Sequence, residues 1–327
     1  MRVLVIGAGA VGSLLGGLLG RRGHDVTLLG RPDHMSAVRE AGLHIDGIWG
    51  TYHVTSLQTS CDSRTLRRTP FDIALVCVKA YDTHSAIEDL RNLDQPNLLV
   101  VSCQNGYGNT QALEEAFGHG RILGARVITG VEMPAPGRVV VTVSADDIRL
   151  GPPRGEPELM ELARNIADTL RQADVPVSAT DKYSEFLWSK ILYNCALNPL
   201  GALLRASYGE LASDPGTRKL MDSIIDEAFV AALANDIRMF WEQPAEYRRH
   251  FYDELIPVTA RHYPSMLRDL ERRGRTEIDV LNGAVVRLAG RVGLETPVNF
   301  ALTSMIKLRE RTRRAELGTG SKQSTEC

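Results

Sequence analysis

The sequence predicts an α/β fold: a doubly wound parallel sheet followed by an all-helical C-terminal domain. Up to about residue 180, short apolar runs alternate with helix-like stretches, which is the pattern of a parallel sheet covered by helices on both faces. Beyond that residue the strand-like runs stop, and apolar residues recur with a helical period. We therefore expect domains at 1–180 and 181–315, and a disordered tail at 316–327.

The strands of the sheet are expected where apolar residues run without interruption, because a parallel strand is buried on both faces. A helix of small residues follows the first of these runs, and Gly23 is a candidate cap for its end. The runs lie at 3–6, 26–29, 72–78, 97–103 and 121–129.

The stretch 131–150 has a different character. Its β-branched runs are separated by turn residues, which predicts antiparallel edge strands. A helix at about 157–173 and a short strand near 175–179 complete the first domain. In the second domain, prolines and glycines separate one helical stretch from the next.

A glycine-rich turn, Gly7-x-Gly9-x-x-Gly12, follows the first strand and opens the first helix. The first glycine permits a tight turn, the second lets a pyrophosphate approach the backbone, and the third lets helix and strand pack closely. The helix N-terminus adds N–H groups and a positive dipole end. The sequence therefore predicts a Rossmann-type doubly wound sheet whose dinucleotide site includes Gly7, Ala8, Gly9, Ala10, Val11 and Gly12.

The end of the second strand bears on the choice of nucleotide. Sites that prefer NAD usually carry Asp or Glu there, which binds the ribose 2′-hydroxyl. This sequence has Leu29-Gly30-Arg31 instead, and a guanidinium suits a phosphate because it donates two parallel hydrogen bonds. We predict NADP(H), with Arg31 at the 2′-phosphate; the alternative is a solvated loop arginine. Lys79 is a second cationic candidate, or else a surface lysine at a strand end.

The stretch 187–204 places one lysine and two amides in an apolar run. Lys190, Asn194 and Asn198 are four residues apart, so they share one face of a helix, at least until Pro199 disturbs its end. Buried lysine and asparagine need partners, which a polar network between domains would supply. Beside a nicotinamide, the ammonium could instead protonate the alkoxide formed by hydride transfer to a ketone, while the amides bind a substrate hydroxyl or carboxylate.

Three further polar residues are candidates. Asn105 follows a buried strand, at the edge where open α/β sheets bind ligands. Thr276-x-x-Asp279 resembles a capping box, which would put Glu277 in the first turn of a new helix. For Ser265 and Glu277, capping or a solvated helix face is an equal alternative to a role in binding.

Composition argues against several classes of function. The net charge of −2 gives no electrostatic reason to expect nucleic acid or an anionic membrane as a partner. The five cysteines form no CxxC pair, and no His, Cys and carboxylate cluster has metal-ligand spacing, so we expect reduced thiols and no metal. No apolar run is long enough for a membrane helix, and no signal peptide is recognisable, which favours a cytoplasmic protein.

These motifs together resemble the ketopantoate reductase family, the 2-dehydropantoate 2-reductases. The related β-hydroxyacid dehydrogenases share a lysine and an asparagine four apart on a helix, but the Asn-Pro ending and the last motif favour the ketopantoate side. The resemblance covers nearly the whole chain, through GAGAVG at 7–12, the arginine at 31, VK at 78–79, QNG at 104–106, KILYNCALNPL at 190–200 and SMLRDLERRGRTEID at 265–279.

The resemblance implies NADPH-dependent reduction of 2-dehydropantoate (ketopantoate) to (R)-pantoate, on the route to pantothenate and coenzyme A. It implies that Lys190 is the proton donor, and that Asn194, Asn198 and Ser265 contact the keto acid.

The same resemblance places Asn105 and Glu277 at the junction of cofactor and substrate, and Lys79 with Arg31 near the adenosine phosphate. Two other functions stay open. The aromatic stretch 238–255 departs from the family pattern and could admit a bulkier 2-oxo acid, or carry a subunit contact. A non-catalytic NADPH-sensing module is the other, although a sensor has no need of a proton donor. The sequence leaves the assembly open between a monomer and a homodimer.

Overall fold

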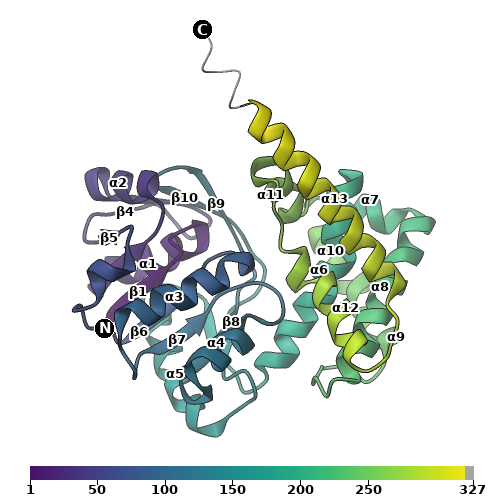
Figure 1. Ribbon diagram of the computed structural model, residues 1–327, viewed down its shortest axis with the longest axis horizontal. Helices are drawn as coiled ribbons and strands as arrows, with labels where there is room; N and C mark the ends of the chain where they lie inside the picture. The colour runs from purple at the N-terminus through teal and green to yellow at the C-terminus, as the bar shows by residue number, and fades with distance from the viewer. Residues whose placement is uncertain (321–327) are drawn as a thin grey trace. The chain divides into compact units, whose positions relative to one another are not determined.

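The computed structural model describes residues 1–320, which form two compact units (Figure 1). The first unit spans Met1–Tyr183 and the second begins at Ser184, a few residues after the expected boundary. A mixed, mostly parallel sheet with helices makes up the first unit, and the second is helical. This architecture confirms the predicted fold class.

Within the described residues, the main sheet of the first unit has eight strands in the order β12-β11-β8-β7-β6-β1-β2-β5. The strands from β8 to β5 are parallel, whereas β11 runs antiparallel to β8. The loops that follow β1, β6 and β7 therefore meet at one edge of the sheet. The strands are β1 Arg2–Ile6, β2 Asp25–Leu29, β5 Gln58–Ser60, β6 Ile73–Val76, β7 Leu99–Ser102, β8 Ile122–Arg126, β11 Ile148–Gly151 and β12 Val177–Ala179.

Helices cover both faces of this sheet because its strands are apolar on both sides. In β1, Val3 and Val5 belong to the hydrophobic core that includes α1 and α5, whereas Leu4 and Ile6 belong to the core that includes α3 and α4. The helices of this unit are α1 Ala10–Arg21, α2 Pro32–Ala41, α3 Thr83–Leu93, α4 Asn109–Phe117 and α5 Pro157–Gln172.

A second, four-stranded sheet has the order β4-β3-β10-β9, and α1 packs between the two sheets. A Cβ at Gly16 would lie 2.7 Å from Leu28 of the main sheet, and one at Gly17 would lie 2.6 Å from Leu43 of the small sheet. The glycines of α1 thus let one helix contact both sheets closely. The strands are β3 Leu43–Gly47, β4 Tyr52–Val54, β9 Thr129–Ala135 and β10 Arg138–Ser144.

This small sheet refines the prediction for 131–150. Strands β9 and β10 are antiparallel, as expected, but they pair with β3 rather than extending the edge of the main sheet. Only β11 of this stretch joins the main sheet. The sequence prediction missed β3, β4 and β5 because these strands are short and lack continuous apolar runs.

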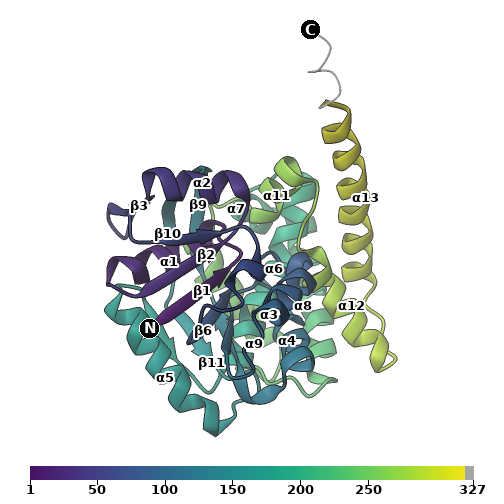
Figure 2. The ribbon, with the colours of Figure 1, turned by 60° about the vertical axis from the view of Figure 1, so that its left-hand side comes forward.

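The second unit is built of the helices α6 to α13, and α6 begins at the boundary residue Tyr183. Figure 2 shows the long helix α13 running beside α12 and beyond it. A π-helical turn, Phe251–Leu255, connects α9 to α10. The helices are α6 Tyr183–Leu204, α7 Tyr208–Ser213, α8 Pro215–Leu233, α9 Pro244–His250, α10 Ile256–Thr259, α11 Ser265–Arg273, α12 Asn282–Arg291 and α13 Pro297–Gly320.

The disordered tail expected at 316–327 begins too early, since α13 continues to Gly320. Residues 321–327, the rest of that stretch, lie outside the described part of the chain. Over residues 1–320, no helix has both the length and the apolarity needed to cross a membrane. In the same part of the chain, no cluster of three or more His, Cys, Asp or Glu is placed to hold a metal ion.

Candidate active site

The glycine turn connects β1 to α1, and packing requires two of its three glycines. Gly7 has φ +88°, and a Cβ there would lie 2.6 Å from the backbone nitrogen of Val78. A Cβ at Gly12 would lie 2.5 Å from the carbonyl oxygen of Gly7. Gly9 differs: beyond its chain neighbours, the nearest described atom to its Cβ would be the Gly7 oxygen at 3.9 Å. The fold leaves open the position at which a pyrophosphate is expected to approach.

The start of α1 fits an anion. The N–H groups of Gly7 and Ala8 both donate to the carbonyl oxygen of Leu29 at 3.0 Å, which ties the turn to β2. Ala10 and Val11 then open the helix, whose first turn contains no acidic residue. The positive end of the helix dipole is therefore not offset by a carboxylate, so the turn can accept phosphate groups.

Lys79 and Asn105 follow β6 and β7, at the same sheet edge as the glycine turn. The residue before Lys79 packs against the turn itself. Asn105 lies in a loop that Gly106 turns with φ +85°, and Asn109 Nδ2 donates to the Asn105 carbonyl oxygen at 2.8 Å. The first unit thus brings the glycine turn, Lys79 and Asn105 together.

A buried hydrogen-bond network holds the loop of Asn105, and the sequence analysis missed it. Ser102 donates to Gln104 Oε1 at 3.2 Å, and Gln104 Nε2 donates to Thr83 Oγ1 at 2.7 Å. Thr83 donates in turn to Asn109 Oδ1 at 3.0 Å. All four side chains are buried. The signal was the glutamine of QNG, since a buried amide directly after a strand needs partners.

Arg31 is exposed where β2 leads into α2. No carboxylate ends β2, but Asp33 lies in the first turn of α2 and is also exposed. Asp33 was not among the candidates from the sequence, although it stands two residues after Arg31. The Arg31 guanidinium suits a 2′-phosphate, whereas the Asp33 carboxylate suits a free ribose hydroxyl. A preference for NADPH or for NADH would therefore show which of the two side chains binds the ribose.

The polar stripe Lys190, Asn194 and Asn198 lies within α6, and its members differ in burial. Asn194 and Asn198 are buried, at 7% and 3% exposure, whereas Lys190 is half-buried. The helix does not end at Pro199, as the sequence suggested, but continues to Leu204. The apolar flanks of the stripe are all buried: Leu187, Trp188, Ile191, Leu192 and Leu197.

One contact fixes the amide of Asn198. The Tyr208 hydroxyl donates to Asn198 Oδ1 at 3.2 Å. Burial raises the pKa of Tyr208, so this hydroxyl stays protonated and remains a donor at neutral pH. Because Oδ1 faces the tyrosine, Nδ2 carries the donor capacity of Asn198. An amide N–H fixed in this way suits a carboxylate or keto oxygen.

Ser265 lies beside the C-terminal end of α6. It is exposed and is the first residue of α11. The preceding Pro264 packs on α6, since a Cβ at Gly201 would lie 2.9 Å from its Cγ. An ion pair of 2.5 Å joins Arg205, the residue directly after α6, to Glu271 of α11. The second unit thus brings Ser265 to the end of the helix that carries the polar stripe.

The capping box predicted at Thr276-x-x-Asp279 forms only in part, since the Thr276 hydroxyl accepts from the N–H of Ile278 at 3.3 Å but the Thr276 N–H bonds to another helix. The N–H and the hydroxyl of Thr276 both donate to Glu310 Oε1 on α13, each at 2.7 Å. Glu310 is 2% exposed, and a buried carboxylate needs such donors, which explains why Thr276 also bonds to a neighbouring helix. Glu277 is buried as well, and it precedes a single 3₁₀ turn, Ile278–Val280, rather than lying in a helix.

Comparison with known proteins identifies the family. The family model for Ketopantoate reductase PanE/ApbA matches residues 3–155, and the model for its C-terminal domain matches residues 183–310. A 2-dehydropantoate 2-reductase from Aquifex aeolicus (strain VF5) is 38% identical over 312 residues, which cover 95% of this chain and 97% of that protein. The chain belongs to the ketopantoate reductase family. It is therefore an oxidoreductase by family.

Solved structures agree with membership in the ketopantoate reductase family. A PanE/ApbA family ketopantoate reductase from Ralstonia eutropha JMP134 has a TM-score of 0.85 at 31% identity, covering 96% of this chain and 100% of that one. The ternary structure of D-mandelate dehydrogenase with NADH and anilino(oxo)acetate has a TM-score of 0.86 at 24% identity, covering 96% and 99%. The second likeness shows a shared fold.

In this member of the ketopantoate reductase family, the aromatic segment 238–255 packs on α6. The hydroxyl of Tyr247 donates to the carbonyl oxygen of Ser189 at 3.0 Å. The ring of Phe251 lies 6.0 Å from that of Tyr193, and both Tyr247 and Phe251 are fully buried. The segment therefore supports the turn of α6 that carries Lys190.

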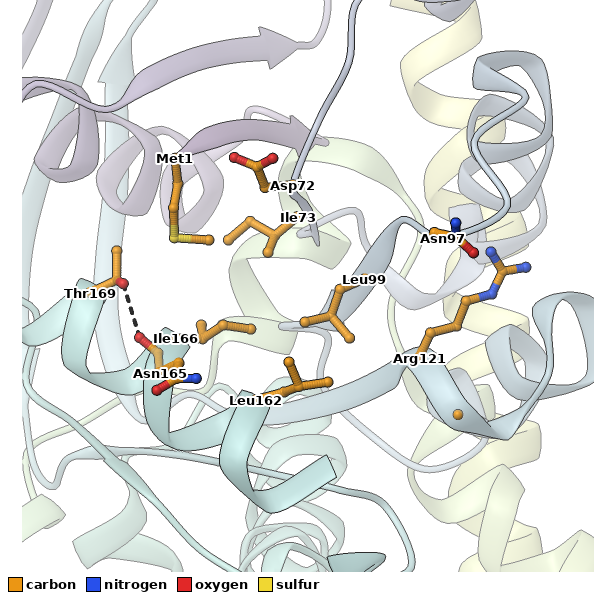
Figure 3. A pocket seen from close by; sticks show the side chains of 11 residues that line it. Met1, Asp72, Ile73, Asn97, Leu99, Arg121, Leu162, Asn165, Ile166 and Thr169 are labelled. Atoms are coloured by element: carbon orange, nitrogen blue, oxygen red, sulfur yellow. Dashed lines mark hydrogen bonds between the residues drawn. The ribbon is translucent and has the colours of Figure 1, made fainter. Parts of the chain in front are cut away.

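A cavity of about 340 Å³ lies at the opposite edge of the first unit's sheet (Figure 3). It is lined by residues at the amino ends of the strands, including Met1, Ile73 and Leu99. The hydroxyl of Thr169, which lines the cavity, donates to the carbonyl oxygen of Asn165 at 2.9 Å. Open α/β sheets bind ligands at the carboxyl ends of their strands, so this cavity is not the candidate active site.

Proposed function

We propose that this protein catalyses the NADPH-dependent reduction of 2-dehydropantoate to (R)-pantoate, a step toward pantothenate and coenzyme A. The observation that carries the proposal is the polar stripe of α6, where Lys190 stands one and two turns from two buried amides. The Oδ1 of Asn198 already accepts from Tyr208, which leaves the Nδ2 of this amide suited to an oxygen of a bound keto acid. The 38% identity with a 2-dehydropantoate 2-reductase supports this substrate.

Lys190 is assigned the proton transfer. When bound at the glycine turn, NADPH supplies a hydride to the keto carbon, and the carbonyl oxygen then requires a proton. The ammonium of Lys190 stabilises the developing negative charge on that oxygen and donates the proton from Nζ. Its half-buried position favours this role, because water screens its charge less than at an exposed site.

The neighbouring polar groups are assigned to substrate binding. Asn198 offers Nδ2 to an oxygen of the keto acid, since its Oδ1 is held by Tyr208. Asn194 lies one turn nearer to Lys190, and Ser265 adds a hydroxyl at the end of α6. These neutral donors can orient a carboxylate and a hydroxyl without changing the net charge of the site. Asn105 and Glu277 are assigned to the junction of cofactor and substrate.

The substrate is tested by NADPH consumption with a panel of 2-oxo acids. 3,3-Dimethyl-2-oxobutanoate is the matched control, because it lacks only the hydroxyl of 2-dehydropantoate. We expect kcat/KM for 2-dehydropantoate to be higher by about 10² or more, since a site built for a hydroxyl rejects the analogue without one. Equal rates on the two compounds would contradict the proposed substrate, and turnover of no 2-oxo acid would favour an NADPH sensor.

A bulkier 2-oxo acid is the second candidate substrate. The observation that favours it is the aromatic segment 238–255, which packs on α6 next to the polar stripe. D-Mandelate dehydrogenase shares this fold, and its structure holds anilino(oxo)acetate. Phenylglyoxylate therefore belongs in the panel. A kcat/KM for phenylglyoxylate above that for 2-dehydropantoate would make the aromatic acid the better assignment.

The cofactor is proposed to be NADPH, with Arg31 and Lys79 at the adenosine phosphate. The proposal predicts that Arg31→Ala lowers kcat/KM for NADPH and leaves kcat/KM for NADH nearly unchanged. Asp33→Ala is the matched variant in the same segment and should not lower kcat/KM for NADPH. Equal use of NADPH and NADH by the wild-type enzyme would contradict the assignment of Arg31.

A further inference from the structure

A proline interrupts the hydrogen bonds of α6 inside the polar stripe. Pro199 lies within the helix and has no N–H, so the carbonyl oxygen of Cys195 lacks its usual donor four residues later. Cys195 is fully buried, so water cannot replace that donor. The two ends of the missing bond, Cys195 and Pro199, directly follow Asn194 and Asn198. The gap therefore lies in the turn that separates the two asparagines.

A side chain from another helix fills this gap. Asn282, the first residue of α12, donates from Nδ2 to the carbonyl oxygen of Cys195 at 3.1 Å. Asn282 is fully buried and stands far from Cys195 in the sequence. The bond that Pro199 removes from the backbone is thus restored by an amide from α12.

The orientation of the Asn282 amide is set by the carboxylate of Glu227, which acts through Asn299. Glu227 on α8 accepts from Asn299 Nδ2 at 2.8 Å and from the Asn299 N–H at 2.9 Å. A carboxylate only accepts, so Asn299 must turn its Oδ1 toward Asn282, whose Nδ2 donates to it at 2.9 Å. The same Nδ2 then directs its second hydrogen to Cys195. Each amide is therefore set by its neighbour.

The arrangement leaves one polar atom without a partner. Among the described residues, Asn282 Oδ1 is buried and makes no hydrogen bond. Such an atom destabilises the fold, and a leucine at this position would not carry that cost. An asparagine at this position is explained if the hydrogen bond from its Nδ2 outweighs that cost. The bond in question is the one to the carbonyl oxygen of Cys195, which Pro199 leaves without a backbone donor.

We infer that Asn282 is a positioning residue, which holds α6 across Pro199 so that Asn194 and Asn198 keep the spacing that binds the 2-oxo acid. The inference rests on the proposed function for its substrate, and on the contacts of Asn282, Asn299 and Glu227 for its geometry. Asn282 acts through the helix and needs no contact with the substrate.

The test is a double-mutant cycle between the two sides of the gap. Asn282→Leu removes the donor, and Pro199→Ala returns a backbone N–H to Cys195. We expect Asn282→Leu to raise KM for the 2-oxo acid about tenfold, with KM for NADPH changed less than about twofold. In the Pro199→Ala background the same leucine should raise KM by less than about threefold, because the backbone then supplies the bond.

A matched control separates this rescue from general stabilisation, since removing a proline stabilises most helices. Asn235→Leu removes a half-buried amide that donates to Ala231 and to Leu288 of α12 rather than to α6 or Asn282, so Pro199→Ala should raise its Tm only as much as it raises that of the wild type. Independent effects of Asn282→Leu and Pro199→Ala on KM and Tm would overturn the inference.

Folding and function remain separable in this design. If Asn282→Leu alone does not fold, recovery of a soluble, cooperatively melting protein by Pro199→Ala supports the inference. An insoluble Asn282→Leu/Pro199→Ala protein beside a soluble Asn235→Leu/Pro199→Ala protein overturns it. If the wild type turns over no 2-oxo acid, the proposed function fails. The double-mutant cycle is then read from Tm alone, and its result still supports or overturns the role of Asn282 in holding α6.

Discussion

The glycine turn and the polar stripe of α6 are built in opposite ways. At the turn, the candidate site consists of backbone groups and of the room left by missing side chains. The sequence shows this room as the glycines Gly7, Gly9 and Gly12. On α6, the site consists of polar side chains in a buried helix, and partners remote in the sequence fix them, such as Tyr208 at Asn198.

The difference teaches where each site is sensitive. A local motif determines the turn. A single methyl group added there is therefore expected to impair either folding or cofactor binding, depending on which glycine carries it. The stripe depends on residues from other helices, so substitutions that touch no ligand can still change substrate binding.

The largest effect is expected at Gly7. An alanine there would place Cβ 2.6 Å from the backbone of Val78, at a φ of +88° that side chains rarely adopt. We expect Gly7→Ala to lower the free energy of unfolding by about 3 kcal/mol or more. Chemical denaturation of the purified variant measures this loss. A variant as stable as the wild type would show that the turn is not constrained by packing.

Gly9→Ala should leave the fold intact and weaken cofactor binding. Among the described atoms beyond its chain neighbours, the nearest to its Cβ would be the Gly7 oxygen at 3.9 Å, so we expect an unchanged Tm. The added methyl group would occupy the space of the pyrophosphate and raise the dissociation constant for NADPH about tenfold or more. Fluorescence titration measures this constant. Unchanged affinity would remove Gly9 from the cofactor site.

A smaller effect is expected from Tyr208→Phe, which removes the hydroxyl that orients Asn198. One hydrogen bond is worth about 1 kcal/mol, so KM for the 2-oxo acid should rise about fivefold, with KM for NADPH unchanged. Steady-state kinetics at saturating NADPH measures the change. Equal increases in both KM values would indicate general loosening of the fold rather than misorientation of one amide.

The smallest effect appears only at alkaline pH. Burial raises the pKa of Tyr193 to about 12. In the unfolded chain the phenol ionises near pH 10, so between these values the folded state binds more protons and stability falls as pH rises. Tyr193→Phe should flatten the decline of Tm above about pH 10 and leave its slope near pH 7 unchanged. Tyr263→Phe, at an exposed site, is the control, and equal flattening by both would contradict the assignment.

The sequence predicted the fold class, the glycine turn and the helical second domain because these depend on local periodicity. It did not predict the small sheet, since β3 and β4 are short and gain their stability from α1 and β10. It did not predict the bonds of Thr276 to Glu310, because this acceptor lies on a different helix. It listed neither Asn282 nor Tyr208, since nothing in the chain around them shows that they contact α6.

The account depends most on Lys190, whose proposed role as proton donor is best tested by kcat at saturating NADPH and 2-oxo acid. Lys219→Ala, which removes an exposed lysine from α8, is the matched control. The account predicts that Lys190→Ala lowers kcat by about 10²–10⁴ and changes the dissociation constant for NADPH by less than about twofold. A Lys190→Ala enzyme that turns over like the Lys219→Ala control would contradict it.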